Sequence, residues 1–153
     1  MTRRAFLIAG LFACLVATGC GQSPPASSLP TVQMKIGSQT FTLEVADTSD
    51  TREHGLMRRD SMPADHGMIF VFTTPTKMAF WMKNTRIPLD VVYIDKNGRV
   101  DSVKQMQPYV ETAVWSEGPL KWAIELNQGT AEKVGVKKGD ILQIPAGAKD
   151  AKE

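Results

Sequence analysis

The amino-acid sequence predicts a mainly β (α+β) protein, either a small barrel or a rolled antiparallel sheet of six to eight short strands with one or two short helices. Apolar and polar residues alternate in several short segments, as at Phe41, Leu43 and Val45, and this period of two is typical of strands with one buried face. Tight-turn pairs separate such segments, Gly-Ser at 37–38 and Asn-Gly at 97–98. Short strands joined by tight turns are typical of small barrels and rolled sheets.

The first half of the chain predicts a hairpin, one helix and a buried strand. TVQMKI and QTFTLEV flank the Gly-Ser pair and are expected to form the hairpin. A short helix is expected from Ser49 to Met57, because Asp50 followed by Glu53 three residues later is a capping pattern. The continuous apolar run GMIFVF is typical of a buried strand, which we expect to end at Thr73-Thr74-Pro75.

The second half predicts a further series of strands. In MAFWMK, residues 78–83, bulky Met and Phe side chains alternate with Ala79, Trp81 and Lys83, so this strand is expected to run to Asn84. Pro88 interrupts the pattern, LDVVYI forms the next strand, and RVDSVKQM follows the Asn-Gly turn. KWAIEL then predicts a strand, GTAEKVGV a single helical turn, and KKGDILQI a turn into a last strand.

Residues 1–19 have the layout of a lipoprotein-type export signal. Arg3 and Arg4 precede an apolar run, and small residues lead to Cys20. The run is too short to cross a membrane comfortably as a helix, which disfavours a retained anchor helix. VATGC resembles a bacterial lipobox, in which Cys20 is diacylated and becomes the new N-terminus. A simple cleaved signal is the alternative.

The lipid on Cys20 predicts where the protein resides. Two or three acyl chains, at about 0.8 kcal/mol per buried methylene, anchor a small domain firmly to a membrane. Gly21 rather than Asp follows Cys20, which by analogy with Gram-negative sorting favours the outer membrane, facing the periplasm. The export route stays open, because TRRAFL resembles a twin-arginine motif while paired arginines also occur in general secretion signals.

Behind the signal we expect a Pro/Ser-rich tether at 20–30, a single β-rich domain at 31–146 and a polar tail at 147–153. The chain has 18 basic and 16 acidic residues, and removing Arg3 and Arg4 leaves 16 of each. A neutral mature domain gives no electrostatic case for nucleic-acid binding. Both cysteines, Cys14 and Cys20, lie in the signal region. An acylated Cys20 therefore leaves the domain no thiol for a disulfide, a nucleophile or a zinc site.

Polar residues interrupt the apolar stretch AFWMKNTRIPLDVVYID at 79–95, and this combination predicts a binding site for a small envelope ligand or glycan, without catalysis. An aromatic face beside a few convergent polar groups is typical of small-molecule sites. The candidate ligand-binding residues are Trp81, Lys83, Asn84, Asp90, Arg52 and Glu125. In the alternative interpretation the stretch is a strand end and a turn, where Asp90 pairs with a basic neighbour because an unpaired buried charge is costly.

Three other functions stay open. An interaction or assembly protein would present the loop YVETAVWSEGPL, with Trp115, to another envelope protein. A hydrolase would use Asp90 and Glu125 as paired carboxylates. Copper(I) binding would use thioethers, since seven of the eight methionines lie beyond the signal, although core filling is the ordinary role of such residues. No cofactor is expected, and the common catalytic motifs do not occur in the sequence.

Several motifs resemble, in order, the domain-of-unknown-function family 192: GLMRR, GMIFVF, FWMKNTRIPLDVVYID, AIELNQGTAEKVGV and KKGDIL. The resemblance covers roughly Thr40 to Ile144, and the FWMKNT…IPLD block is its most specific part. It implies a small, mainly β, often exported domain and supplies no mechanism, because the biochemical function of the family has not been assigned. The segment YVETAVWSEGPL departs from the family pattern, in which many relatives have a shorter run of small polar residues.

Overall fold

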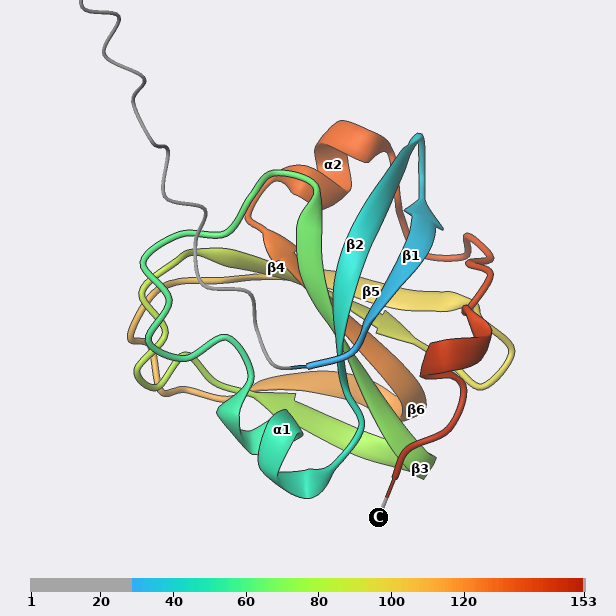
Figure 1. Ribbon diagram of the computed structural model, residues 1–153, viewed down its shortest axis with the longest axis horizontal. Helices are drawn as coiled ribbons and strands as arrows, with labels where there is room; N and C mark the ends of the chain where they lie inside the picture. The colour runs from blue at the N-terminus through green and yellow to red at the C-terminus, as the bar shows by residue number, and fades with distance from the viewer. Residues whose placement is uncertain (1–28, 153) are drawn as a thin grey trace, which may run out of the picture.

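The computed structural model describes residues 29–152, which form a single six-stranded sheet with two short α-helices and one 3-10 turn (Figure 1). The export signal at 1–19, Cys20 and the tether up to residue 28 lie outside the described residues. The elements in chain order are β1 (Thr31–Ile36), β2 (Gln39–Ala46), α1 (Ser49–His54), β3 (His66–Phe80), β4 (Leu89–Ile94), β5 (Val100–Met106), β6 (Val114–Asn127), α2 (Thr130–Val134) and η1 (Ala146–Ala148).

The sheet is rolled and open, which settles the choice between barrel and rolled sheet. The strand order is β1-β2-β3-β6-β4-β5, so β1 and β5 are its two edges. The expectation of a wholly antiparallel sheet is wrong at one pair, because β2 and β3 run parallel. A parallel pair needs a long crossover rather than a tight turn, and the segment at 47–65 that contains α1 supplies it.

β3 is one long strand that folds back on itself, where the sequence predicts two strands separated at Thr73-Thr74-Pro75. Its pairing with β6 shifts register between Val71 and Thr76. The rings of Phe70 and Phe80 lie 4.8 Å apart between centroids, whereas ten extended residues would span about 33 Å. The irregular pairing therefore marks a sharp bend, and the second arm of β3 runs across the bottom of Figure 1 beside the first part of β6.

Two further expectations about strands are wrong. The predicted loop around Trp115 is the first part of β6, and Trp115 pairs with Ala79 of β3. The predicted last strand in KKGDILQI is reduced to an isolated bridge between Arg99 and Ile141. The segment still hydrogen-bonds around the start of β5, where the Val100 N–H donates to the Asp140 carbonyl and the Leu142 N–H to the Gly98 carbonyl, both at 2.8 Å.

Helix α1 begins at Ser49 as expected but ends at His54, three residues before the predicted end. Its cap is Thr48, whose hydroxyl accepts from the Thr51 backbone N–H while the Thr51 hydroxyl accepts from the Thr48 N–H. The Asp50–Glu53 capping pattern is not used. Gly55 ends the helix with φ of 50°, a conformation that glycine adopts without strain.

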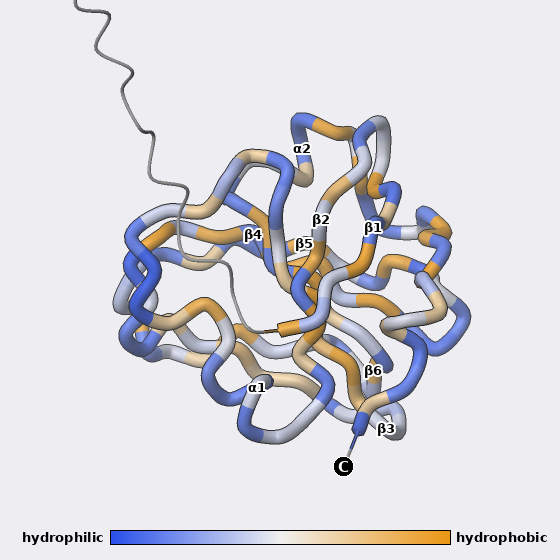
Figure 2. The backbone as a smooth tube through the Cα atoms, in the orientation of Figure 1, coloured by the Kyte–Doolittle hydropathy of each residue, from blue (hydrophilic) through white to orange (hydrophobic). Residues whose placement is uncertain are grey.

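Each face of the sheet covers its own apolar core, and the two cores give the fold its apolar centre (Figure 2). The α2-side core includes Ile36, Phe41, Leu43, Ile124, Leu126 and Val134. The α1-side core includes Leu56, Met68, Phe70, Phe80, Val91 and Tyr93. Five methionines pack in the α1-side core: Met62, Met68, Met78, Met82 and Met106.

The C-terminal segment, for which the sequence predicts a polar tail at 147–153, packs against the rest of the domain up to residue 152. Ala148 is fully buried in the α2-side core, and its carbonyl accepts a hydrogen bond of 2.8 Å from the Trp122 indole. Lys152 donates its backbone N–H to the Asp47 carbonyl at 2.8 Å. Within residues 29–152, none of the helices has the length and apolar composition that crossing a membrane requires.

Candidate functional site: a cavity at Glu125

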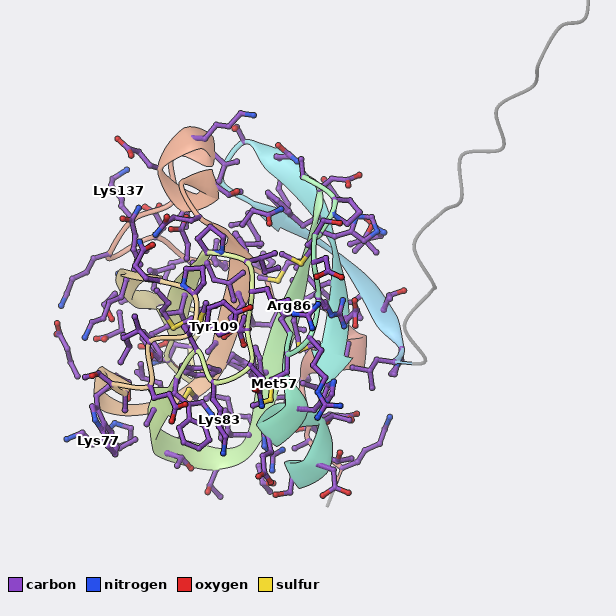
Figure 3. All side chains as sticks on the ribbon, turned by 90° about the vertical axis from the view of Figure 1, so that its left-hand side faces the viewer. Met57, Lys77, Lys83, Arg86, Tyr109 and Lys137 are labelled. Atoms are coloured by element: carbon purple, nitrogen blue, oxygen red, sulfur yellow. The ribbon has the colours of Figure 1, made fainter. Side chains whose placement is uncertain are left out.

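A cavity of about 330 Å³ lies between α1 and the two arms of β3. The fold-back of β3 creates it, because residues on both sides of the bend, Phe70 and Phe80, reach the same space. Figure 3 faces the side of the molecule that carries Met57, a lining residue, and Lys83. The lining residues are Ser49, Arg52, Glu53, His54, Gly55, Leu56, Met57, Phe70, Phe72, Ala79, Phe80, Trp81, Thr85 and Glu125.

Aromatic rings form much of the cavity wall. Phe70 and Phe80 meet edge to face with an interplanar angle of 81°, and Phe80 also meets Tyr93 at 5.8 Å between centroids. Trp81 is 44% exposed at the outer end of the lining. Rings held edge to face leave part of their faces open to a guest, so these walls suit a flat or ring-shaped apolar body.

Glu125 is the buried acid of the lining, with a residue exposure of 4%. It lies on β6 between Met68 of β3 and Val91 of β4, which places its side chain on the α1-side face. Burial raises the pKa of Glu125 to about 8, against a smaller lowering by Arg59. Among residues 29–152 the Glu125 carboxyl makes no hydrogen bond or ion pair. A buried carboxyl of this kind is uncommon, because buried polar groups are ordinarily hydrogen-bonded.

Arg59 does not neutralise Glu125, because its guanidinium is bound elsewhere. Its Nη1 and Nη2 atoms donate to the two carboxylate oxygens of Glu44 at 2.5 and 2.7 Å. Such a fork-to-carboxylate pair is the strongest ordinary geometry for an arginine. Burial and the nearby Glu125 carboxyl both raise the pKa of the Tyr93 hydroxyl, which donates to the Val114 carbonyl at 2.6 Å.

Arg52 belongs to the lining but serves mainly to hold α1 on the sheet. Its Nη1 atom donates to the carbonyls of Val71 and Asp47 at 2.9 and 3.2 Å, and its guanidinium lies 5.0 Å from the Phe72 ring centroid. These contacts join α1 to β3 at the bend. Arg52 therefore positions a wall of the cavity through its Nη1 atom, which is one of the three donor nitrogens of the guanidinium group.

Three of the six residues predicted for the site lie together in the cavity lining: Trp81, Arg52 and Glu125. Lys83 lies next to them but outside the lining, with its Nζ atom 5.1 Å from the Trp81 ring centroid. Asn84 also lies outside the lining. Its φ of 54° and its carbonyl, which accepts from the Arg58 N–H at 2.8 Å, make it a turn residue, as the alternative interpretation held.

Asp90 lies on the opposite face of the sheet from Glu125. It pairs with Leu126, which points into the α2-side core, whereas Glu125 pairs with Val91 of the α1-side core. The Oδ2 atom of Asp90 accepts from the Ala131 N–H at 2.9 Å and so fixes the start of α2. Neighbouring positions on a strand point to opposite faces, so Asp90 and Glu125 cannot act on one substrate as paired carboxylates.

The remaining lining residues were not predicted from the sequence. Phe70, Phe72 and the α1 residues other than Arg52 line the cavity only because β3 bends, and no local sequence pattern predicts that bend. Glu125 had a usable signal, since it is a lone acid within the apolar run WAIEL. Metal binding has no support from His, Cys, Asp or Glu side chains, which form no ligand-like group within the described part of the chain.

Comparisons with known proteins place this geometry in a family. The model of DUF192, described as Uncharacterized ACR, matches residues 32–144. A crystal structure of a proposed transcription regulator from Sinorhizobium meliloti 1021 is similar at 36% identity and a TM-score of 0.69, covering 74% of this chain and 91% of that one.

A crystal structure of a protein of unknown function from Novosphingobium aromaticivorans DSM 12444 is similar at 34% identity and a TM-score of 0.72, covering 79% of this chain and 90% of that one. No curated protein matches the chain. The family model covers well over half of the sequence, and both structures share the fold at more than 30% identity. The chain therefore belongs to the domain-of-unknown-function family 192.

Proposed function

We propose that this protein binds a small organic ligand in the cavity at Glu125, without catalysis, and that it does so at the cell envelope on a lipid anchor at Cys20. The observation that carries the binding proposal is the Glu125 carboxyl, which is 4% exposed, lacks a partner among residues 29–152 and borders a cavity of about 330 Å³. Small-molecule sites combine apolar or aromatic walls with polar groups that orient the ligand. This cavity has both, since six of its fourteen lining residues have polar or charged side chains.

The size and the walls of the cavity limit the ligand. Its volume is near the lower end of the range for ligand pockets, which suits a single ring with a short polar extension rather than an extended glycan. Phe70, Phe80 and Trp81 favour a ring that can stack or meet their edges. We therefore expect the ligand to consist of a single ring that contacts these aromatic side chains and a polar group that points to Glu125.

The binding proposal is tested by thermal unfolding against a panel of single-ring compounds, monosaccharides and peptidoglycan fragments. A ligand at about 100 times its Kd adds roughly 2.7 kcal/mol to stability, which raises Tm by several degrees for a domain of this size. Glu125→Gln should reduce the shift, while Glu111→Gln makes the same chemical change at an exposed position outside the cavity and should leave it unaltered. Equal shifts in both variants would remove Glu125 from the site.

The envelope location rests on the sequence of the first 20 residues. In cells grown with a labelled fatty acid, the protein should carry the label and fractionate with the outer membrane. Cys20→Ser should abolish labelling and release the protein from the membrane fraction, because the substitution removes the acylated thiol. Labelled Cys20→Ser protein would contradict the proposed attachment site.

A second candidate function, contact with another envelope protein, is favoured by the exposed ring of Trp115. This side chain is 52% exposed on β6, with the Lys77 Nζ atom 5.5 Å from its ring centroid. Tryptophan is enriched in protein–protein hot spots. A partner captured by the wild-type protein and lost with Trp115→Ala, but kept with Glu125→Gln, would establish this surface as separate from the cavity.

A further inference from the structure

The charges around the cavity favour one class of ligand. The ionisable side chains of the lining are Arg52, Glu53, His54 and Glu125. Arg52 is bound to the Val71 and Asp47 carbonyls, and Arg59, the cation that acts on Glu125, is bound to Glu44. The buried carboxyl is thus the polar group that still needs a partner, and the nearby guanidinium groups do not supply one.

The rings at the cavity already attract cations. Lys83 places its ammonium 5.1 Å from the centroid of Trp81, and Arg52 lies 5.0 Å from that of Phe72. Aromatic faces bind ammonium groups through the negative potential above the ring, with tryptophan the strongest. A carboxyl enclosed by rings offers a cationic guest both an ion-pair partner and several such faces.

We propose that the ligand is a small organic amine, in which a protonated primary amino group on a single-ring apolar body pairs with the Glu125 carboxylate inside the aromatic walls. This inference rests on the proposed binding function and names its ligand class. A neutral ligand would leave the carboxyl with only a hydrogen bond, and an anionic ligand would meet repulsion from the carboxyl once it is ionised. The amine alone satisfies both the carboxyl and the rings.

Binding of an amine to Glu125 should be coupled to the release of a proton. With its pKa raised to about 8 by burial, Glu125 is mostly protonated at pH 6, whereas a primary amine is protonated up to about pH 10. Binding the ammonium therefore releases the carboxyl proton to solvent. Arg59 and Tyr93 interact electrostatically with Glu125, and Arg59 is itself bound to Glu44. The other ionisable groups of the cavity lining are Arg52, Glu53 and His54.

The amine is tested by calorimetric titration of the full chain in detergent micelles with benzylamine, benzyl alcohol and benzoate at pH 6, 7 and 8. Benzylamine should bind most tightly, and its affinity should rise about 50-fold from pH 6 to pH 8, as the carboxylate fraction does for a pKa of about 8. Benzyl alcohol should bind more weakly, with no such rise. Benzoate should not bind.

Variants separate the ligand class from the site. Glu125→Gln keeps the shape and a polar amide, so it should lose benzylamine binding and its pH dependence while retaining benzyl alcohol; Glu111→Gln should behave as wild type. Preferential binding of benzyl alcohol or benzoate overturns the amine and leaves the binding cavity standing. No binding of any of the three, with no shift in the wider panel, overturns both proposals.

Discussion

Glu125 combines a position inside the sheet with the chemistry of a binding group. Its neighbours across β3 and β4 are Met68 and Val91, so an aliphatic side chain would suit the position better for stability alone. Asp90, equally buried, shows the contrast, because its Oδ2 atom is committed to the Ala131 N–H. Asp90 thus stabilises the start of α2, while Glu125 borders the cavity.

The stability of the protein should fall as pH rises from about 4.5 to 8, with Glu125 as a major cause. Its pKa in the folded state is raised from 4.5 to about 8, so the folded protein retains a proton that the unfolded chain loses within this range. The slope from this group reaches about 1.4 kcal/mol per pH unit. Urea unfolding at pH 5, 6, 7 and 8 should show the decline in wild type and a flatter profile in Glu125→Gln. Parallel profiles would mean that Glu125 ionises normally.

We expect that Asn84 is needed for its left-handed backbone conformation and that its side chain does not contact the ligand. With φ of 54°, Asn84→Gly should leave the free energy of unfolding nearly unchanged, whereas Asn84→Ala should lower it by about 1 kcal/mol, since alanine is strained in the left-handed region. Both variants should bind the cavity ligand as wild type does. A loss of binding by Asn84→Gly at unchanged stability would return Asn84 to the site.

Among the elements, sequence patterns correctly predicted those strands and turns that depend mainly on neighbouring residues in the chain. The alternation in MAFWMK correctly placed Met78, Phe80 and Met82 inside and left Trp81 and Lys83 exposed. The hairpin around Gly37 and the Asn-Gly turn also formed as predicted. The β3 bend could not be predicted in the same way, because it is fixed by pairing with β6, more than 30 residues away, and by the packing of Phe70 on Phe80.

The candidate site, too, could be predicted only in part from the sequence. Trp81, Arg52 and Glu125 were among the residues predicted for the site, and all three lie in the cavity lining. Lys83 and Asn84 were grouped with Trp81 because they are close in sequence. Lys83 lies beside the Trp81 ring but outside the lining, and Asn84, with φ of 54°, lies in a turn beyond the end of β3. Proximity along the chain was therefore a poor guide to proximity in the cavity.

The β1–β2 hairpin depends on Gly37 for its contact with α2. Gly37 has φ of 56°, and a Cβ atom there would lie 2.1 Å from the Val134 carbonyl oxygen. Gly37→Ala should therefore cost more stability than Gly129→Ala, where φ is 81° but no atom lies within 4 Å of the added carbon. We expect about 1 kcal/mol for the control, from left-handed strain alone, and a larger loss at Gly37 by urea unfolding. Equal losses would show that the hairpin moves freely relative to α2.

The two faces of the sheet differ in the elements that cover them. The α2-side face is covered by α2, by η1 and by the C-terminal segment, with Trp122 and Ala148 joined by a hydrogen bond. It has a cleft of about 440 Å³ of its own, beside Ala131 and Val136. The α1-side face is incompletely filled, because the folded-back arm of β3 meets α1 across the cavity. Under the proposed function, the α2-side core keeps the sheet stable while the cavity on the α1-side face receives the ligand.

This division predicts that the C-terminal segment stabilises the fold without contributing to binding. Deleting residues 146–153 removes Ala148 from the α2-side core and leaves the Trp122 indole N–H without its acceptor, which should lower stability by about 2–3 kcal/mol and shift Trp fluorescence. Lys152→Ala breaks only the partly exposed ion pair with Asp47 and should cost less than about 1 kcal/mol. At a temperature where the shortened protein is still folded, its affinity for the cavity ligand should equal that of wild type. A weakened affinity in the fully folded shortened protein would mean that the two faces are coupled through the sheet, so that the α2-side core also contributes to binding.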